Sequence, residues 1–230
     1  MPIKYLGKTG QISLKLIEVV NKVSSIDILY TEETMKNFNE SIEVLKKYNK
    51  EPFHIEHGIT VGLVLGWFAK NAGMSDAEVE YWKTVGLLHD IDFEMYPEEH
   101  CKKCVELLKN EGYDEEFIKS VCSHGFGNCT DIEPSKEMEK VLFTVDELTG
   151  IIFAAAKMRP SKSCTDMELS SLKKKFKDKR FAAGCDREVI KLGAEKYMQC
   201  ELDEVLNKTL DAMKENEANI RELLSAHIGQ

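Results

Sequence analysis

Hydrophobic residues recur at helical spacing along most of this chain. The pattern is clearest over residues 75–88, where Val79 and Val85 lie on one apolar face. Ser75 at the start of this segment and Glu78 three residues later form a capping box, in which each side chain satisfies a backbone N–H of the first turn. These signals together predict a helix that ends just after Leu88.

The same period appears elsewhere, with residues that begin or end helices at the segment boundaries. Thr31 is the expected N-cap of the first helix, and Pro97 fits the first turn of another. No segment carries a strong β-hairpin signal, and residues 1–30 fit either a short helix or a strand, so we expect an all-α fold. Besides 75–88, the predicted helices cover residues 31–49, 53–70, 97–112, 114–125, 136–157, 166–175, 186–198 and 202–225.

Three glycines stand four residues apart in the second of these helices, at Gly58, Gly62 and Gly66. Each costs about 1 kcal/mol relative to alanine inside a helix. Their common face indicates the close approach of another backbone, although the glycines could also simply weaken the helix.

Composition narrows the class of protein. The chain has 230 residues, 43% of them hydrophobic and 31% charged, which is ordinary for a globular protein. Its formal net charge of −9 argues against a nucleic acid polymer or an anionic membrane as the main partner. No apolar run reaches membrane-spanning length, and the N-terminus has no signal-peptide pattern, so we expect a cytoplasmic protein. The seven cysteines are accordingly expected as reduced thiols.

His89 and Asp90 stand side by side at the end of the predicted helix 75–88. Adjacent residues on a helix point about 100° apart, so packing alone satisfies a buried histidine–aspartate pair poorly. A divalent cation bound to both side chains removes this difficulty. The alternative is a C-terminal histidine followed by an aspartate that caps the next element. Other metal-competent residues on or beside helices are His57, His100, His124 and Asp146.

The order His … His-Asp … Asp on successive helices resembles the HD superfamily of metal-dependent phosphohydrolases. The closer match is to a subgroup of predicted bacterial and archaeal HD hydrolases whose substrate is not settled, and it covers roughly residues 32–215. This resemblance implies an HD-domain helical bundle over 31–160, with 1–30 as an N-terminal extension and additional C-terminal helices over 161–230 that pack on the core. The stretches that carry it are Leu87–Glu94, Leu142–Leu148, Asp146–Gly150 and Lys173–Ala183.

The resemblance also implies a ligand set and a reaction. It assigns one divalent metal to His57, His89, Asp90 and Asp146, and a second to His100 and His124 with Asp90 as the bridge. Manganese, iron, zinc, cobalt and magnesium are not distinguished. The implied reaction is the hydrolysis of a small phosphate ester or nucleotide by a metal-activated water at Asp90.

Two acids of the loop after His89, Asp92 and Glu94, are candidates to orient the water or protonate the leaving group. The competing interpretation is a solvated acidic loop. A cluster of cations is a second candidate feature, because it could clamp the phosphates of an anionic substrate; its competing interpretation is a solvated face. These cations are Lys157, Arg159, Lys174, Lys175, Lys177 and Arg187.

Three alternatives remain open at this point. Cys101 and Cys104 have the spacing of a zinc pair, but ordinary semi-buried thiols fit the pattern better. The same scaffold could hold two irons and perform an oxygen-dependent oxidation. It could also bind a metal or nucleotide as a regulatory protein without turnover. The oligomeric state is not predicted.

Overall fold

The structure is a computed structural model, and it describes residues 36–228. Helices α3 (Pro52–Asn71) and α4 (Asp76–Leu88) form its centre and pack against each other along their length. A Cβ atom on Gly62 would lie 2.7 Å from the carbonyl oxygen of Lys83, and one on Gly58 would lie 2.6 Å from that of Leu87. The two helix backbones therefore approach as closely as the glycine spacing predicted.

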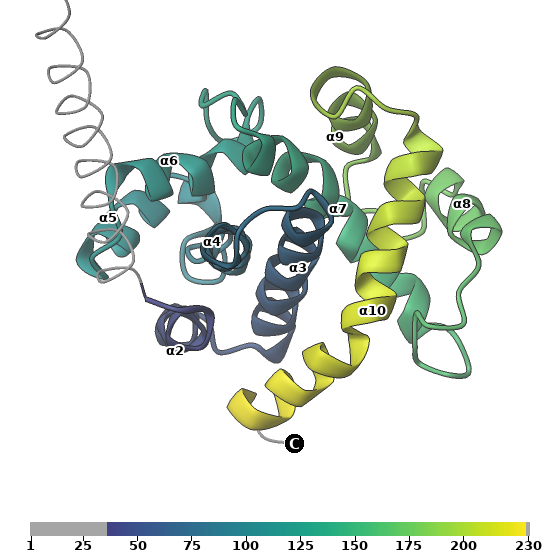
Figure 1. Ribbon diagram of the computed structural model, residues 1–230, viewed down its shortest axis with the longest axis horizontal. Helices are drawn as coiled ribbons and strands as arrows, with labels where there is room; N and C mark the ends of the chain where they lie inside the picture. The colour runs from purple at the N-terminus through teal and green to yellow at the C-terminus, as the bar shows by residue number, and fades with distance from the viewer. Residues whose placement is uncertain (1–35, 229–230) are drawn as a thin grey trace, which may run out of the picture. The chain divides into compact units, whose positions relative to one another are not determined.

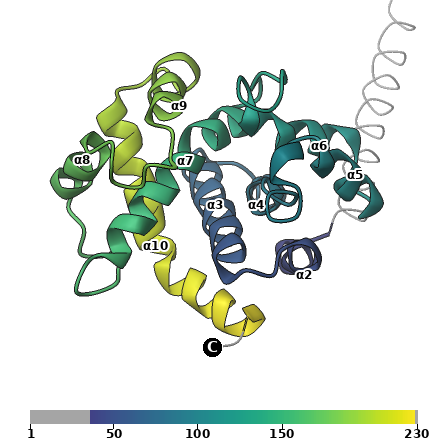
Figure 2. The ribbon, with the colours of Figure 1, turned by 180° about the vertical axis from the view of Figure 1, so that it is seen from behind.

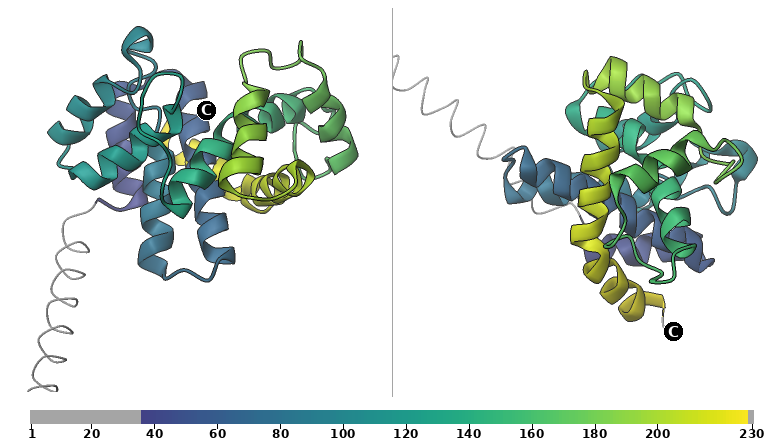
Figure 3. Two further views of the ribbon diagram at one scale, coloured as in Figure 1. Left: turned by 90° about the horizontal axis from the view of Figure 1, so that it is seen from above. Right: turned by 90° about the vertical axis from the view of Figure 1, so that its right-hand side faces the viewer.

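The other helices surround this pair (Figure 1). Helix α10 runs beside α3 and α7, while α5 and α6 lie at one end of the molecule and α8 and α9 at the other; the view from behind and the view from above show the same arrangement (Figures 2 and 3). The surrounding helices are α2 (Phe38–Tyr48), α5 (Lys103–Asn110), α6 (Glu115–Cys122), α7 (Glu137–Lys157), α8 (Leu169–Lys177), α9 (Arg187–Leu192) and α10 (Leu202–Ile228).

The all-α prediction is confirmed for residues 36–228. In that range the only strand-like pairing is an isolated bridge between Phe126 and Thr130. Three shorter helical turns connect the helices: η1 (Pro97–Glu99), η2 (Ser123–Gly125) and the π-helical η3 (Gly193–Tyr197). None of the described helices is long and apolar enough to cross a membrane.

From Asn37 onward the chain forms one compact unit. Helix α10, from the expected C-terminal segment, packs on α3 and α7, and α9 packs on α7. Residues of the sequence after 160 thus complete the bundle around the central helices. The expected extension over 1–30 lies outside the described residues.

The first described helix starts later than predicted. Helix α2 begins at Phe38, where Asn37 accepts a hydrogen bond from the Glu40 backbone N–H (3.0 Å) and Glu40 accepts one from the Asn37 N–H (2.8 Å). Thr31, the predicted N-cap, lies outside the described residues. The reciprocal bonds of Asn37 and Glu40 explain why the helix starts at Phe38.

The prediction of one continuous helix over 97–112 is wrong. The chain makes only the short turn η1, and α5 starts at Lys103. Between them Cys101 adopts a left-handed backbone conformation with φ of 62°, which costs a non-glycine residue about 1–2 kcal/mol. The N–H of Cys104 in the first turn of α5 donates to the Asp92 carboxylate (2.7 Å), and this bond helps fix the start of the helix. The break turns His100 and Cys101 toward the centre of the molecule.

Candidate metal centre

Four of the six expected ligands form a first group around the end of α4. His57 comes from α3, His89 and Asp90 follow α4, and Asp146 comes from α7. The Nε2 atoms of His57 and His89 lie 3.0 and 3.2 Å from Oδ1 of Asp146. The same two nitrogens lie 3.6 and 3.3 Å from Oδ2 of Asp90. Metal-competent atoms of residues as far apart in the sequence as His57 and Asp146 thus lie at one point.

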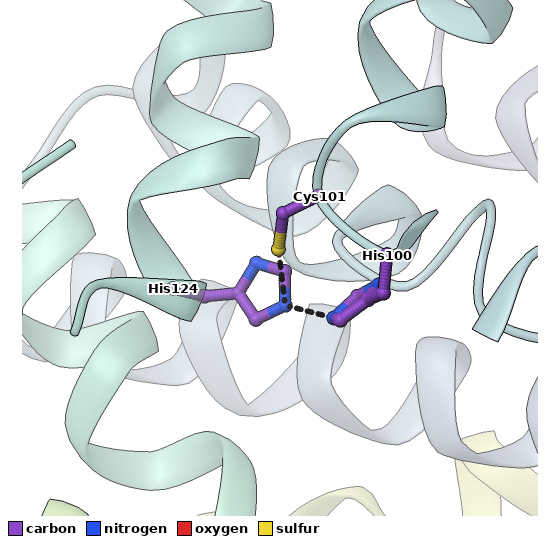
Figure 4. A group of neighbouring side chains, drawn as sticks. All are labelled: His100, Cys101 and His124. Atoms are coloured by element: carbon purple, nitrogen blue, oxygen red, sulfur yellow. Dashed lines mark hydrogen bonds between the residues drawn. The ribbon is translucent and has the colours of Figure 1, made fainter. Parts of the chain in front are cut away.

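The other two expected ligands, His100 and His124, form a second group beside the first. Their Nε2 atoms lie 3.1 Å apart, and Oδ1 of Asp90 lies 3.5 and 3.4 Å from them. The two oxygens of Asp90 therefore face different groups. Cys101 joins the second group, because its Sγ lies 3.8 Å from Nε2 of His124 (Figure 4).

The imidazoles of this centre are oriented by their other nitrogen. In three of them Nδ1 lies within hydrogen-bond distance of an atom that can only accept, so Nδ1 carries the proton and the neutral ring presents its Nε2 lone pair to the centre. The pairs are His89 Nδ1 with Gly86 O (2.8 Å), His124 Nδ1 with Val121 O (2.6 Å) and His100 Nδ1 with Asp92 Oδ1 (2.8 Å). Metal-binding histidines are typically held in this way.

The residues fit a bound cation. Nε2 of His89 is fully buried and has no hydrogen-bond partner among the described residues. Nε2 of His100 and Nε2 of His124 lie 3.1 Å apart, close enough to share a proton in the metal-free protein or to bind one cation together. Imidazole nitrogens and carboxylate oxygens suit zinc, manganese, iron and cobalt alike. Two groups at this centre could therefore hold metal ions, one at His57, His89 and Asp146 and one at His100, Cys101 and His124.

The pKa shifts of these groups indicate the same demand for positive charge. Burial by itself lowers the pKa of His89, but the carboxylates of Asp90 and Asp146 outweigh burial and raise the pKa well above its ordinary value. Burial likewise raises the pKa of Asp146, yet His89 and His57 hold that pKa far below its usual range. In the metal-free protein, protons on His89 and His124 therefore supply charge that a metal ion would otherwise supply.

Asp92, a predicted catalytic acid, is bonded to other groups of the protein. Its side chain is fully buried. Oδ1 accepts from Nδ1 of His100, and Oδ2 accepts from the backbone N–H of Cys104 at 2.7 Å. Both oxygens are thus committed to holding other groups, and Asp92 positions His100 from behind.

Glu94 also has a structural partner. Its carboxylate accepts from the backbone N–H groups of Lys50 (2.9 Å) and Glu51 (3.1 Å), immediately before α3. The acid therefore ties the loop that follows Asp90 to the start of the helix that carries His57. Sequence alone placed Glu94 in the right loop but could not show which way its side chain points.

The predicted phosphate clamp is dispersed. Lys157 pairs with Glu56 (3.4 Å), the neighbour of His57, while Arg159 pairs with Asp166 (2.8 Å). Lys174, Lys175 and Lys177 lie on α8, which packs on α7 and α10 at the far end from α5 and α6 (Figure 1).

Arg187 serves a different purpose from substrate binding. Its buried guanidinium donates hydrogen bonds to the backbone carbonyl oxygens of Ala182 and Cys185, each at 2.7 Å. It also donates to the carbonyl of Phe181. Arg187 therefore holds together the loop between α8 and α9.

Two exposed phenylalanines beside the centre were not predicted as site residues. Phe53 is 54% exposed and its ring lies parallel to that of His57, with centroids 6.3 Å apart. Phe93 is 41% exposed and meets the edge of His100 with centroids 5.1 Å apart. Exposed aromatic rings are uncommon among ordinary surface residues. The signal available in the sequence was an aromatic residue close before each histidine.

Glu147 is a further acid that sequence reasoning did not single out. Burial, and then the charge of the neighbouring Asp146, raises the pKa of its carboxyl to about 7. A carboxyl with such a pKa can carry a proton near neutral pH, which is the property of a general acid. The only signal for Glu147 in the sequence was its position directly after Asp146, one of the expected ligands.

Comparison with protein-family models, with curated proteins and with solved structures gives no match.

Proposed function

We propose that this protein is a metal-dependent phosphohydrolase of the HD type. The observation that carries the proposal is the position of Asp90, whose two oxygens face two separate groups of ligand atoms. A carboxylate between two metal positions can hold two ions close together, and two adjacent ions can stabilise the attacking and leaving oxygens of phosphoryl transfer. The buried Nε2 of His89 supports the same proposal, because it makes no well-formed hydrogen bond and lies 3.2 Å from an oxygen of Asp146 and 3.3 Å from one of Asp90, as expected of ligand atoms around one cation.

The chain's own residues would prepare the centre for a phosphate. His57, His89, Asp90 and Asp146 would hold one metal, and His100 and His124 would hold the other together with Asp90. When bound, such metals supply Lewis acidity and lower the pKa of a coordinated water from 15.7 to about 7. Since the imidazoles are neutral ligands, two divalent ions outweigh the carboxylates of Asp90 and Asp146, and the remaining positive charge favours an anionic substrate.

The surroundings of the centre favour a particular kind of ester. Phe53 and Phe93 expose ring surface next to His57 and His100. Aromatic side chains stack on flat apolar groups, and nucleobases are the commonest such groups joined to phosphate. We therefore expect a small phosphate ester with a flat leaving group, such as a nucleotide.

The test combines metal analysis with phosphate release. Protein purified without chelators or affinity nickel should contain close to two metal ions per chain and should release phosphate from a panel of nucleotides and small phosphate esters. Asp90→Ala should lose bound metal and lower turnover by more than the 10–100-fold typical of residues behind the ligands. Asp131→Asn, a change at an exposed acid on the loop before α7, is the matched control and should keep both properties.

Three results would contradict the proposal. A fully active, metal-replete Asp90→Ala protein would remove the ligand assignment. Bound iron with substrate-dependent oxygen uptake and no phosphate release would indicate the oxygenase instead. Tight nucleotide binding by the metal-loaded wild type without turnover would indicate a regulatory protein.

A further inference from the structure

Four of the cysteines lie next to the second ligand group and form two pairs. The Sγ atoms of Cys101 and Cys129 are 2.8 Å apart, and those of Cys104 and Cys122 are 3.1 Å apart. Both members of the second pair are fully buried, whereas Cys129 is partly exposed. The pair Cys101–Cys129 therefore combines close sulfurs with a route for a small reagent.

The backbone holds both members of this pair in place. Cys101 sits in the left-handed break between η1 and α5. Cys129 sits in a tight turn, in which the carbonyl oxygen of Gly125 accepts from the N–H groups of Asn128 and Cys129 at 3.0 Å each. A Cβ atom on Gly125 would collide with both sulfurs. The fold thus leaves a space at this glycine that the two sulfurs fill together.

We propose that Cys101 and Cys129 form a redox pair that a hydroperoxide converts into a disulfide. The thiol of the more accessible Cys129 loses its proton, its sulfur attacks one oxygen of hydrogen peroxide, and the O–O bond breaks. The leaving hydroxide takes up that proton, so that a sulfenic acid and one water result. The Cys101 sulfur then attacks the sulfenic sulfur, the S–O bond breaks, and the departing oxygen leaves as a second water. Two thiols and one hydrogen peroxide become one disulfide and two waters. The sulfurs need to close from 2.8 Å to only about 2.05 Å.

The pair lies where its oxidation state matters for metal binding. Sγ of Cys101 lies 3.8 Å from Nε2 of His124 and belongs to the same metal-competent group as His100 (Figure 4). A thiolate is a metal ligand, and a disulfide sulfur is a far poorer one. This inference rests on the function proposed above: oxidation would weaken metal binding at His100 and His124. It would leave the group of His57, His89 and Asp146 intact.

The first experiment tests the disulfide without reference to activity. Reduced full-length protein, freed of reductant and treated with equimolar hydrogen peroxide, is digested with trypsin and chymotrypsin; trypsin cuts between Cys101 and Cys104, and chymotrypsin cuts after Phe126, between Cys122 and Cys129. We expect an intact mass lower by two hydrogens, a Cys101–Cys129 linked peptide, and its loss on reduction with dithiothreitol.

Matched variants assign the reaction to this pair. Cys101→Ser and Cys129→Ser should abolish the linked peptide, whereas Cys200→Ser, a change at another partly exposed cysteine, should keep it. The proposal is overturned if folded wild-type protein yields no Cys101–Cys129 link, if Cys104 and Cys122 link in preference, or if a zinc ion bound by these sulfurs blocks oxidation.

A second measurement tests the coupling to the metal centre. Manganese or zinc titrated into oxidised and reduced protein should bind at His100 and His124 at least about 10-fold less tightly after oxidation, and dithiothreitol should restore the affinity. Equal affinities in the two states would overturn the coupling, even where the disulfide itself forms. Failure of the phosphatase assay alone would not affect either result, since both readouts are independent of turnover.

Discussion

At the scale of single residues, the side chain of Asp92 holds His100 from behind, although Asp92 is not one of the proposed ligands. Nδ1 of His100 donates to Asp92, so Nε2 is left as the lone-pair nitrogen and faces His124. A carboxylate behind an imidazole also increases the basicity of the ring. The second oxygen of Asp92 accepts from the N–H of Cys104. One buried acid thus connects the start of α5 to the metal centre.

Asp92→Asn tests this role. The carboxylate receives two donors, and asparagine offers one acceptor oxygen and one NH₂ group, so one donor would face another donor. We expect the site of His100 and His124 to lose about 10–100-fold in metal affinity, while the site of His57, His89 and Asp146 is unchanged. Competition titration with a metal-binding dye measures both constants.

The control for this experiment is Glu94→Gln, since Glu94 belongs to the same loop but holds backbone groups near α3. It should leave both metal affinities unchanged. If Asp92→Asn instead binds both metals normally but loses turnover, Asp92 acts on the substrate, as the sequence first suggested.

At the scale of secondary-structure elements, a buried carboxylate at the start of α7 links two helices that carry ligands. Glu139 is fully buried. It accepts from the hydroxyl of Ser120 on α6 (2.8 Å) and from the N–H groups of Ser135 (2.8 Å) and Lys136 (3.0 Å). Helix α6 leads into His124, and α7 carries Asp146. The position of one ligand relative to the other therefore depends in part on this acid.

We expect Glu139 to make the free energy of unfolding depend on pH in the acid range. Burial raises its pKa, but the N–H groups of Lys136 and Ser135 outweigh burial and hold the pKa below the ordinary value of 4.5. Since the folded pKa is lower than the unfolded one, the ionised form stabilises the fold above about pH 4.5, and this contribution is lost as the pH falls through the folded pKa.

Glu139→Gln should cost about 1–3 kcal/mol at neutral pH. In urea unfolding, its difference from wild type should shrink as the pH falls below about 4.5. A difference that stays constant with pH would show that the charge of Glu139 is not what stabilises this junction.

The sequence predicted correctly those helix ends that are set by residues close to them in the chain. The capping box of Ser75 and Glu78 is present as expected, and the helix ends at Leu88 with His89 as its C-cap. The break at Cys101 could not be predicted, because a left-handed cysteine has no local signal and depends on contacts such as the bond between Asp92 and Cys104. The same distinction applies to the centre. Its ligand residues could be proposed from their types and order, whereas the inward or outward direction of Asp92 is a tertiary property.

At the scale of the whole molecule, the candidate metal centre is the point at which separate parts of the bundle meet. His57 comes from α3, Asp146 from α7 and His124 from η2, while His100 lies in the turn before α5. Only η2 and α7 of these elements follow each other along the chain; the others are separated by further helices. Without metal, the carboxylates keep protons on His89 and His124 instead, as their raised pKa values indicate.

Metal removal should therefore lower the stability of the entire unit and not only abolish a local function. A ligand at 100 times its dissociation constant stabilises the folded state by about 2.7 kcal/mol, and for a chain of this size that corresponds to a rise in Tm of about 5–10 °C. We expect chelation to lower Tm by this amount in calorimetry and manganese or zinc to restore it. Asp90→Ala should show no dependence of Tm on metal, because the carboxylate that both groups share is gone. If the wild type and Asp90→Ala respond equally to metal, the ions bind elsewhere, and the helices around α3 and α4 are held together by packing alone.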